Sequence, residues 1–342
     1  MEPFALVVLI VFIALLFDFF NGFNDAANSI ATIVATRVLT PGQAVFWAAF
    51  FNFIAAFGFG TAVAKTIGSG MVNTDIVTSY VVIGGLIGAV FWTWLASHLG
   101  LPISASHALV GGYAGAAMAR VGVTEGWSNV LNGIVPEGWI WTMAFIFCAP
   151  LMGLAAGAGL MVAVSWIFRK AHPKAMDHYF RRFQLFSSAV FSFAHGTNDA
   201  QKTMGIIASA LFAGGFIEQF YIPYWVILAA HAAIALGTFL GGWRVIRTMG
   251  HRITKLNPAG GFCAETGGAF TVLFAATIGV PASTTHTIAG AIVGVGTAHR
   301  FRAVRWGKTT EILWAWVITI PTTVAVGGLA YLTIHFLVPG AR

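Results

Sequence analysis

The feature that most constrains the fold is a succession of long apolar segments along the whole chain. They lie at about 4–20, 43–63, 76–99, 103–122, 139–168, 184–211, 223–246, 261–279, 282–298 and 310–337. Only 8% of the 342 residues are Asp, Glu, Lys or Arg, whereas an ordinary soluble domain has about 25%. A membrane-spanning helix needs roughly 20 predominantly apolar residues. The sequence therefore predicts an all-α polytopic membrane protein with about ten hydrophobic spans and excludes a soluble enzyme.

The Lys and Arg residues are distributed unevenly over the connections between these segments. If ten helices cross the bilayer, fourteen of the 18 basic residues fall on one face and three on the other. Cytoplasmic connections of membrane proteins carry the excess of Lys and Arg. We therefore expect a multi-pass protein with both termini on the non-cytoplasmic side and the lipid bilayer around it. The net charge of +7 belongs to these connections, so we expect no nucleic-acid partner.

Two polar motifs occur twice, in the same order. Gly22–Ala26 recurs at 196–200, and Leu101–His107 recurs at 280–286, at offsets of 174 and 179 residues. Each half contains five apolar segments, and an odd number places the second copy upside down in the bilayer, as in the inverted repeats of secondary transporters. We predict an N-terminal transmembrane repeat, a basic cytoplasmic linker and a C-terminal transmembrane repeat, at 1–168, 169–183 and 184–342.

The first motif places carboxylates at membrane depth. Asn24-Asp25 and Asn198-Asp199 follow apolar runs, and the adjoining Asn and Gly residues favour a break in the helix. We therefore expect broken or re-entrant helices whose ends form ion sites. An intramembrane carboxylate is a candidate cation ligand or proton carrier. The alternative is that each Asp only caps a half-helix.

The second motif places hydroxyl groups where a helix begins. A Pro in each copy precedes the hydroxyl side chains of Ser104, Ser106, Ser283, Thr284 and Thr285. Free backbone N–H groups and the positive end of the helix dipole suit an anion there. Two such helix ends, one from each half, would surround a tetrahedral oxyanion with neutral donors. The alternative is that the hydroxyls are ordinary N-caps and interhelical hydrogen bonds.

Five further ionisable residues lie within the apolar segments. His107 and His286 are candidate anion donors or proton-linked switches, or else interior histidines that fix helix geometry. Asp18 and Glu265 could carry protons, and Lys202 could pair with an acid or with substrate unless it snorkels to the interface.

Three of these motif copies closely resemble the duplicated signatures of the inorganic phosphate transporter (PiT) family, and in particular its bacterial low-affinity permeases. They are Gly22–Asn28, Gly196–Lys202 and Pro281–His286. The resemblance implies a secondary active transporter of the bacterial inner membrane that imports inorganic phosphate and has no catalytic residue and no permanently bound cofactor. It further implies coupling to sodium in many members, and to protons in the bacterial branch, where a divalent metal accompanies phosphate as a neutral complex. A homo-oligomer remains open.

The same resemblance assigns site residues. It implies substrate binding by Asn24, Ser104, Ser106, Asn198, Ser283, Thr284 and Thr285. Binding of the coupling ion falls to Asp25, Asp199 and Glu265, and the identity of any metal is unknown.

One departure from the family pattern bears on the coupling ion. Sodium-coupled members typically carry a Glu in the second span and another in the eighth, whereas this chain has Asn52 and retains only Glu265. The loss of one carboxylate favours proton symport, with Glu265 as the proton carrier. The alternatives are a sodium-coupled phosphate symporter and a sulfate permease of the same fold. A remote one is an intramembrane hydrolase built from Ser106 or Thr285 with His107 or His286.

Overall fold

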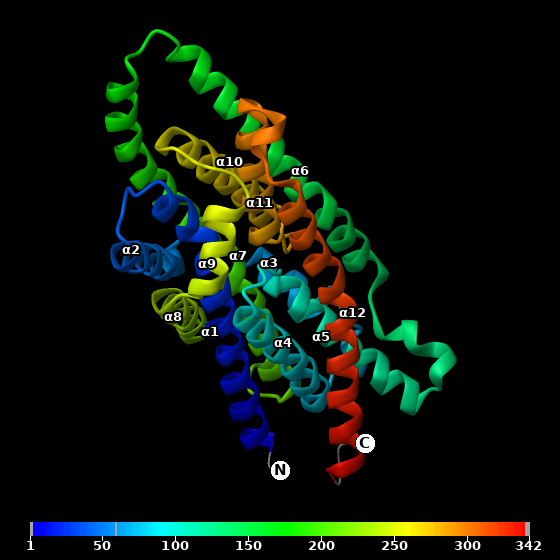
Figure 1. Ribbon diagram of the computed structural model, residues 1–342. Helices are drawn as coiled ribbons and strands as arrows, with labels where there is room; N and C mark the ends of the chain where they lie inside the picture. The colour runs from blue at the N-terminus through cyan, green and yellow to red at the C-terminus, as the bar shows by residue number, and fades with distance from the viewer. Residues whose placement is uncertain (1–2, 59, 339–342) are drawn as a thin grey trace.

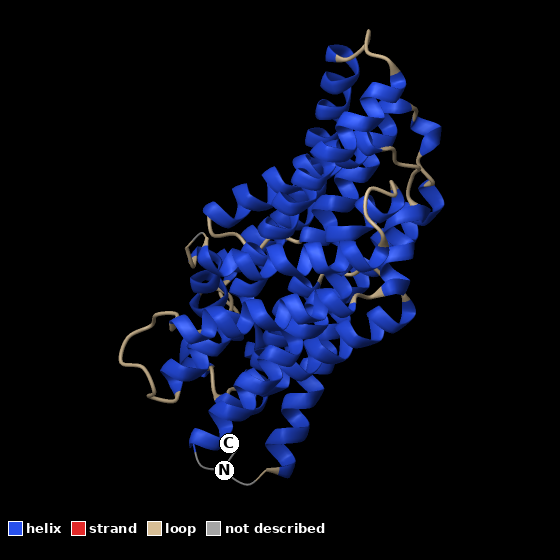
Figure 2. Ribbon diagram, turned by 90° about the vertical axis from the view of Figure 1, so that its left-hand side faces the viewer, coloured by secondary structure: helices blue, strands red, loops and turns tan. Residues whose placement is uncertain are grey.

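The computed structural model describes residues 3–58 and 60–338, and these residues form helices and connecting loops without a β-strand (Figure 2). The helices of the first half are α1 (Pro3–Ala35), α2 (Pro41–Ile54), α3 (Ala62–Ser69), α4 (Ser79–Leu99), α5 (Ala105–Thr124) and α6 (Pro136–Ile167). Those of the second half are α7 (Pro173–Ala213), α8 (Tyr224–Leu240), α9 (Trp243–Arg252), α10 (Pro258–Thr277), α11 (Thr284–His299) and α12 (Trp306–Leu337). Both chain ends lie at the same end of the molecule (Figure 1).

Each predicted apolar segment coincides with a helix or with consecutive helices. Within the described chain, α1, α4, α6 and α12 are each long and apolar enough to cross a membrane. The pairs α2–α3 and α8–α9 bend by 84° and 74°, and they raise the number to six if each pair is one span. Ten crossings therefore stay a prediction.

Large apolar side chains cover the outer faces of the long helices. On α6, Phe147 is 69% exposed, and on α12, Phe336 is 75% exposed. A monomeric soluble protein rarely exposes contiguous apolar surface on this scale. This surface is suited to lipid and makes the chain an integral membrane protein.

The expectation of a helix break at the Asn-Asp motifs is wrong, because α1 and α7 run continuously through both of them. Their glycines serve helix packing instead. A Cβ atom on Gly22 would lie 2.1 Å from the Ile234 carbonyl oxygen, and one on Gly196 would lie 2.6 Å from the Asn52 carbonyl oxygen. Close packing of neighbouring helices thus outweighs the weak helix propensity of Asn and Gly.

The helices break at the second motif. Gly100 after α4 and Gly279 after α10 have φ of 72° and 75°, the left-handed conformation that glycine adopts without strain. The chain then runs without helix to Ser104 and Ser283, which precede α5 and α11. Both breaks lead directly into the hydroxyl-rich segments.

The two halves pack reciprocally. Helix α1 packs on α8 as α7 packs on α2, and α5 packs on α12 as α11 packs on α6. In the second case a Cβ atom on Gly115 would lie 2.1 Å from the Val324 carbonyl oxygen, and one on Gly294 would lie 2.1 Å from that of Leu154. Equivalent residues of the repeat therefore make equivalent contacts across the molecule.

The expected linker 169–183 is largely helical, because α7 begins at Pro173. Helix α7 then continues without interruption into the polar centre of the molecule, so the second half begins with a helix of 41 residues.

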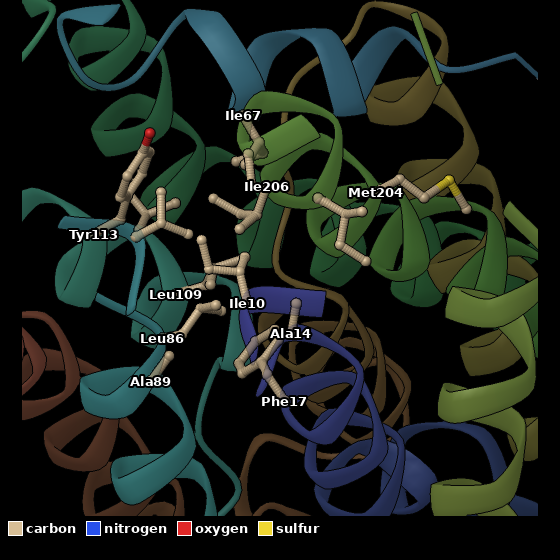
Figure 3. Close-up of a cluster of buried hydrophobic side chains, with 14 of the residues drawn as sticks. Ile10, Ala14, Phe17, Ile67, Leu86, Ala89, Leu109, Tyr113, Met204 and Ile206 are labelled. Carbon is tan, nitrogen blue, oxygen red and sulfur yellow. The ribbon is translucent and has the colours of Figure 1, made fainter. Parts of the chain in front are cut away.

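An apolar cluster occupies the interior between the polar centre and the end that bears the termini. Figure 3 shows its side chains pointing toward one another from α1, α3, α4, α5 and α7. Phe17 lies eight residues before Asp25 on α1, and Met204 lies five residues after Asp199 on α7. The cluster therefore separates the two motif carboxylates from that end of the molecule.

Candidate functional site

The Asn-Asp segments of α1 and α7 meet the first turns of α5 and α11 in the interior. Asp25 is 2% exposed, Asp199 is 1% exposed, and Ser106 and Thr284 are also buried. The two sequence motifs of both halves thus form one buried polar cluster.

Hydroxyls at the start of α11 connect the two carboxylates. Thr284 Oγ1 lies 3.3 Å from Asp25 Oδ2 and 3.1 Å from Asp199 Oδ2, so its single hydroxyl proton can serve either one. Thr285 Oγ1 donates to Asp25 Oδ1 at 3.2 Å. Asn28, one turn after Asp25, donates to Thr285 Oγ1 at 2.9 Å. The hydrogen bonds to Asp25 thus come from neutral hydroxyls, and His195 Nε2 lies farther away, 3.8 Å from Asp25 Oδ2.

A lysine completes the Asp199 side. The Lys202 ammonium forms an ion pair with Asp199 and donates to Ser106 Oγ at 2.5 Å and to the Ala282 carbonyl oxygen at 3.2 Å. Lys202 has no exposed surface, so it does not snorkel to the interface. A buried charge needs a partner of opposite sign, and Asp199 supplies it.

His195 faces the same carboxylates and is held by Asn52. Thr238 donates its hydroxyl to a backbone carbonyl one turn earlier and therefore accepts from Asn52 Nδ2, at 2.9 Å. Asn52 Oδ1 then lies 3.1 Å from His195 Nδ1, which must carry a proton because a carbonyl oxygen only accepts. The other ring nitrogen, Nε2, lies 3.1 Å from Asp199 Oδ2. A second proton on Nε2 would give an imidazolium that satisfies both neighbours.

The motif asparagines differ in their surroundings. Asn24 Nδ2 donates to Ser97 Oγ at 2.9 Å and to the Leu101 carbonyl oxygen at 3.4 Å, which ties α1 to the end of α4. The Asn198 side chain is fully buried, and neither its oxygen nor its nitrogen has a hydrogen-bond partner among the described residues. Asn198 therefore has free hydrogen-bonding capacity for a ligand.

Ser104 and Ser283 form N-caps, the alternative that the sequence left open. Ser104 Oγ accepts from the His107 backbone N–H, and Ser283 Oγ accepts from that of His286, each at 3.2 Å. Each Oγ uses a lone pair for the cap and keeps its hydroxyl proton for donation.

Glu265 lies in a separate polar cluster. Its Oε1 accepts from Thr32 Oγ1 at 2.6 Å and from Gln184 Nε2 at 3.0 Å, and its Oε2 accepts from Ser187 Oγ at 2.5 Å. Thr32 follows Asp25 by seven residues on α1, which is about 10 Å along a helix. Glu265 is thus separated from the paired carboxylates, in the direction away from the termini.

The motif histidines contact each other instead of a carboxylate. The rings of His107 and His286 lie 4.7 Å apart, and His286 stacks on Trp316 at 3.7 Å. Within residues 3–58 and 60–338, no carboxylate hydrogen-bonds either imidazole. The orienting acid that a Ser-His or Thr-His hydrolase would need is not provided by the described residues.

Asp25, His195 and Asp199 are close enough to hold a cation together. One ligand atom of each lies within 4.8 Å of the others. Lys202 already neutralises Asp199, so a divalent ion at this point would face an ammonium group. The arrangement is better suited to a proton or a monovalent ion.

Sequence reasoning missed His195 and the role of Asn28, whereas it named an acid as one of the possible partners of Lys202. These residues stand where the two halves differ: His195 aligns with Asn21, and Lys202 aligns with Asn28. A residue-by-residue alignment of the two motif copies identifies these positions from the sequence alone.

Comparison with known proteins places the chain among transporters. The model of the phosphate transporter family matches residues 21–327. The chain is 51% identical to a probable low-affinity inorganic phosphate transporter of Rhizobium meliloti (strain 1021) over 329 residues, which cover 96% of each chain. It is 39% identical to a protein of the same description from Bacillus subtilis (strain 168), over 97% of this chain and 98% of that one.

A solved structure shares the fold. The sodium-dependent phosphate transporter superimposes with a TM-score of 0.89 at 26% identity, covering 98% of this chain and 100% of that one. The helical arrangement of Figure 1 is therefore that of a phosphate transporter.

Proposed function

We propose that this protein imports inorganic phosphate across the cytoplasmic membrane by proton symport. The chain belongs to the phosphate transporter family, and the relatives compared above are named as transporters, not as enzymes. The observation that carries this proposal is the meeting of Asp25 and Asp199 with the first turns of α5 and α11 in one buried cluster. A cation site and an anion site share their side chains there, as coupled transport requires.

Phosphate would bind between the starts of α5 and α11. Ser106 accepts from Lys202 and keeps its hydroxyl proton for phosphate, and Asn198 has a free amide. Thr284 and Thr285 would donate to phosphate by turning their hydroxyl protons away from the carboxylates. Helix N-termini add free N–H groups and a favourable dipole. These donors are mostly neutral, so phosphate can be released as well as captured. Ser104, Ser283 and Asn24 would then act mainly by holding the two helix starts in place.

The coupling proton would lie in the carboxylate cluster. The orientation of Asn52 supports a proton on His195 Nδ1. The Asp199 carboxylate oxygen, 3.1 Å from Nε2, supports a second proton on that nitrogen. Glu265 would form a second proton position, since its three hydrogen-bond donors come from α1 and α7, the helices that carry the Asn-Asp motifs. A divalent metal that travels with phosphate would meet Asp25, which accepts hydrogen bonds from the neutral hydroxyls of Thr284 and Thr285.

We further propose two five-helix repeats that are inverted in the bilayer, with ten crossings and both termini outside the cytoplasm. The reciprocal packing of α1 on α8 and α7 on α2 supports a repeat. A cavity of about 340 Å³ supports the orientation, because it gathers basic residues from separate connections. They are Arg244, Arg247, Arg252 and Lys308. Rocking of the halves would then give alternating access.

The test is phosphate uptake by purified protein in liposomes. We expect accumulation of labelled phosphate under an inward proton gradient without sodium, and no effect of an inward sodium gradient at fixed pH. Accumulation that requires sodium would leave the assignment of phosphate as substrate intact but would make sodium the coupling ion. The structural neighbour is named as sodium-dependent. Movement of sulfate in place of phosphate would overturn the substrate assignment.

A further inference from the structure

We propose that the Lys202 ammonium is a tethered cation that fills the cation position of the C-terminal half. Of the two equivalent positions at the motif carboxylates, one is then left for an exchangeable cation, at Asp25 in the N-terminal half. The inference rests on the proposed phosphate transport and adds a residue that determines how many cations accompany each turnover.

The surroundings of Lys202 Nζ have the composition of an alkali-cation site. Its three partners are a carboxylate of α7 (Asp199), a hydroxyl in the first turn of α5 (Ser106) and a carbonyl in the non-helical stretch before α11 (Ala282). Hard cations take oxygen ligands of these kinds. In transporters, carbonyls of unwound helix segments coordinate the coupling cation. Here the three oxygens surround an ammonium instead.

The N-terminal half has the same arrangement without the charge. Asn28 follows Asp25 by three residues, as Lys202 follows Asp199. Asn28 donates to Thr285 at the start of α11, whereas Lys202 donates to Ser106, the repeat equivalent of Thr285, at the start of α5. Equivalent side chains therefore reach equivalent hydroxyls, and only the C-terminal half brings its own cation.

The cost of burial explains why the ammonium keeps its position. Lys202 has no exposed surface and is bonded to a buried carboxylate. Separating the pair without another partner would leave two uncompensated charges in a low-dielectric interior. Because the ammonium is covalently attached to α7, it cannot cross the membrane with phosphate. Each cycle would carry one cation fewer than a fully symmetric site would carry.

The test replaces Lys202 with the residue of the other half. In K202N the three oxygens would lose their ammonium and become available to sodium. We would measure the melting temperature of the full chain in detergent with NaCl or choline chloride at equal chloride concentration. Sodium should raise the melting temperature of K202N by about 2 °C or more at about ten times its dissociation constant. Labelled phosphate uptake by K202N should become dependent on sodium.

Two further variants complete the experiment. K170N removes a lysine that is exposed after α6 and should melt and transport like the wild type at every sodium concentration. K202Q provides a second amide if K202N does not fold. Equal sodium shifts for wild type, K202N and K202Q would overturn the inference. The melting shift needs no transport, so it tests Lys202 even if wild-type protein fails to accumulate phosphate, a failure that would count against the proposed function alone.

Discussion

Replacing each motif carboxylate with its amide should affect stability very differently in the two halves. Asp199 neutralises the Lys202 ammonium, whose other partners are the Ser106 hydroxyl and a backbone carbonyl. Asp25 accepts from the neutral hydroxyls of Thr284 and Thr285. The substitution D199N therefore removes the carboxylate that Lys202 contacts directly. The substitution D25N leaves the Lys202–Asp199 pair in place and removes only a longer contact to His195 Nε2, at 3.8 Å.

The expected magnitudes follow from these contacts. Removing one partner of a buried ion pair costs about 3–5 kcal/mol, and weakening neutral hydrogen bonds to a buried group costs about 1–3 kcal/mol. For 342 residues, an unfolding entropy of about 2.1 cal/mol/K per residue converts these costs to decreases in melting temperature of roughly 4–7 °C for D199N and 1–4 °C for D25N.

Thermal unfolding of both variants in one detergent, in sodium-free buffer, measures this difference. The double variant D199N/K202N removes both charges and should recover most of the loss that D199N causes. Equal melting temperatures for D25N and D199N, or a double variant no more stable than D199N alone, would refute the reasoning from the Lys202–Asp199 pair.

Three other substitutions give distinct outcomes. E265Q should abolish proton-driven accumulation of phosphate but preserve phosphate exchange across the liposome membrane without a gradient, because Glu265 lies apart from Asp25 and Asp199. Loss of exchange in E265Q would place Glu265 in the substrate site. G196A brings a Cβ atom within 2.6 Å of the Asn52 carbonyl oxygen and should cost about 1–3 kcal/mol of stability. G159A is the control and should melt like the wild type, because a Cβ atom on Gly159 would meet no described atom outside its own stretch of helix within 4 Å. N52L removes the acceptor for His195 Nδ1 and should lower the uptake rate up to about tenfold, since one hydrogen bond contributes roughly 0.5–1.5 kcal/mol. Uptake by N52L at the wild-type rate would show that the orientation of His195 by Asn52 plays no part in the mechanism.

The sequence was informative about which residues meet. Repetition of the Asn-Asp and Ser/Thr segments indicated a shared site, and the structure brings Asp25, Asp199 and Thr284 together. The sequence allowed three outcomes for Lys202, namely pairing with an acid, pairing with substrate and snorkelling. Its burial next to Asp199 excludes snorkelling and shows the pairing with an acid.

Local propensity misled the prediction where packing decides the backbone. Gly22 and Asn21 favour a break when the segment is considered alone, yet α1 continues because Gly22 lets α8 approach closely. The distance between Glu265 and Asp25 likewise depends on how α10 packs against α1 and α7. His195 was missed because its partner Asn52 lies 143 residues away in the chain.

The most direct test of the account is a cryo-electron microscopy map of the protein in lipid with saturating phosphate. The account predicts tetrahedral density between the first turns of α5 and α11, within hydrogen-bond distance of Ser106, Thr284 and Asn198. Density confined to the basic cavity lined by Arg244 and Lys308, with the buried cluster unchanged, would contradict the proposed substrate site.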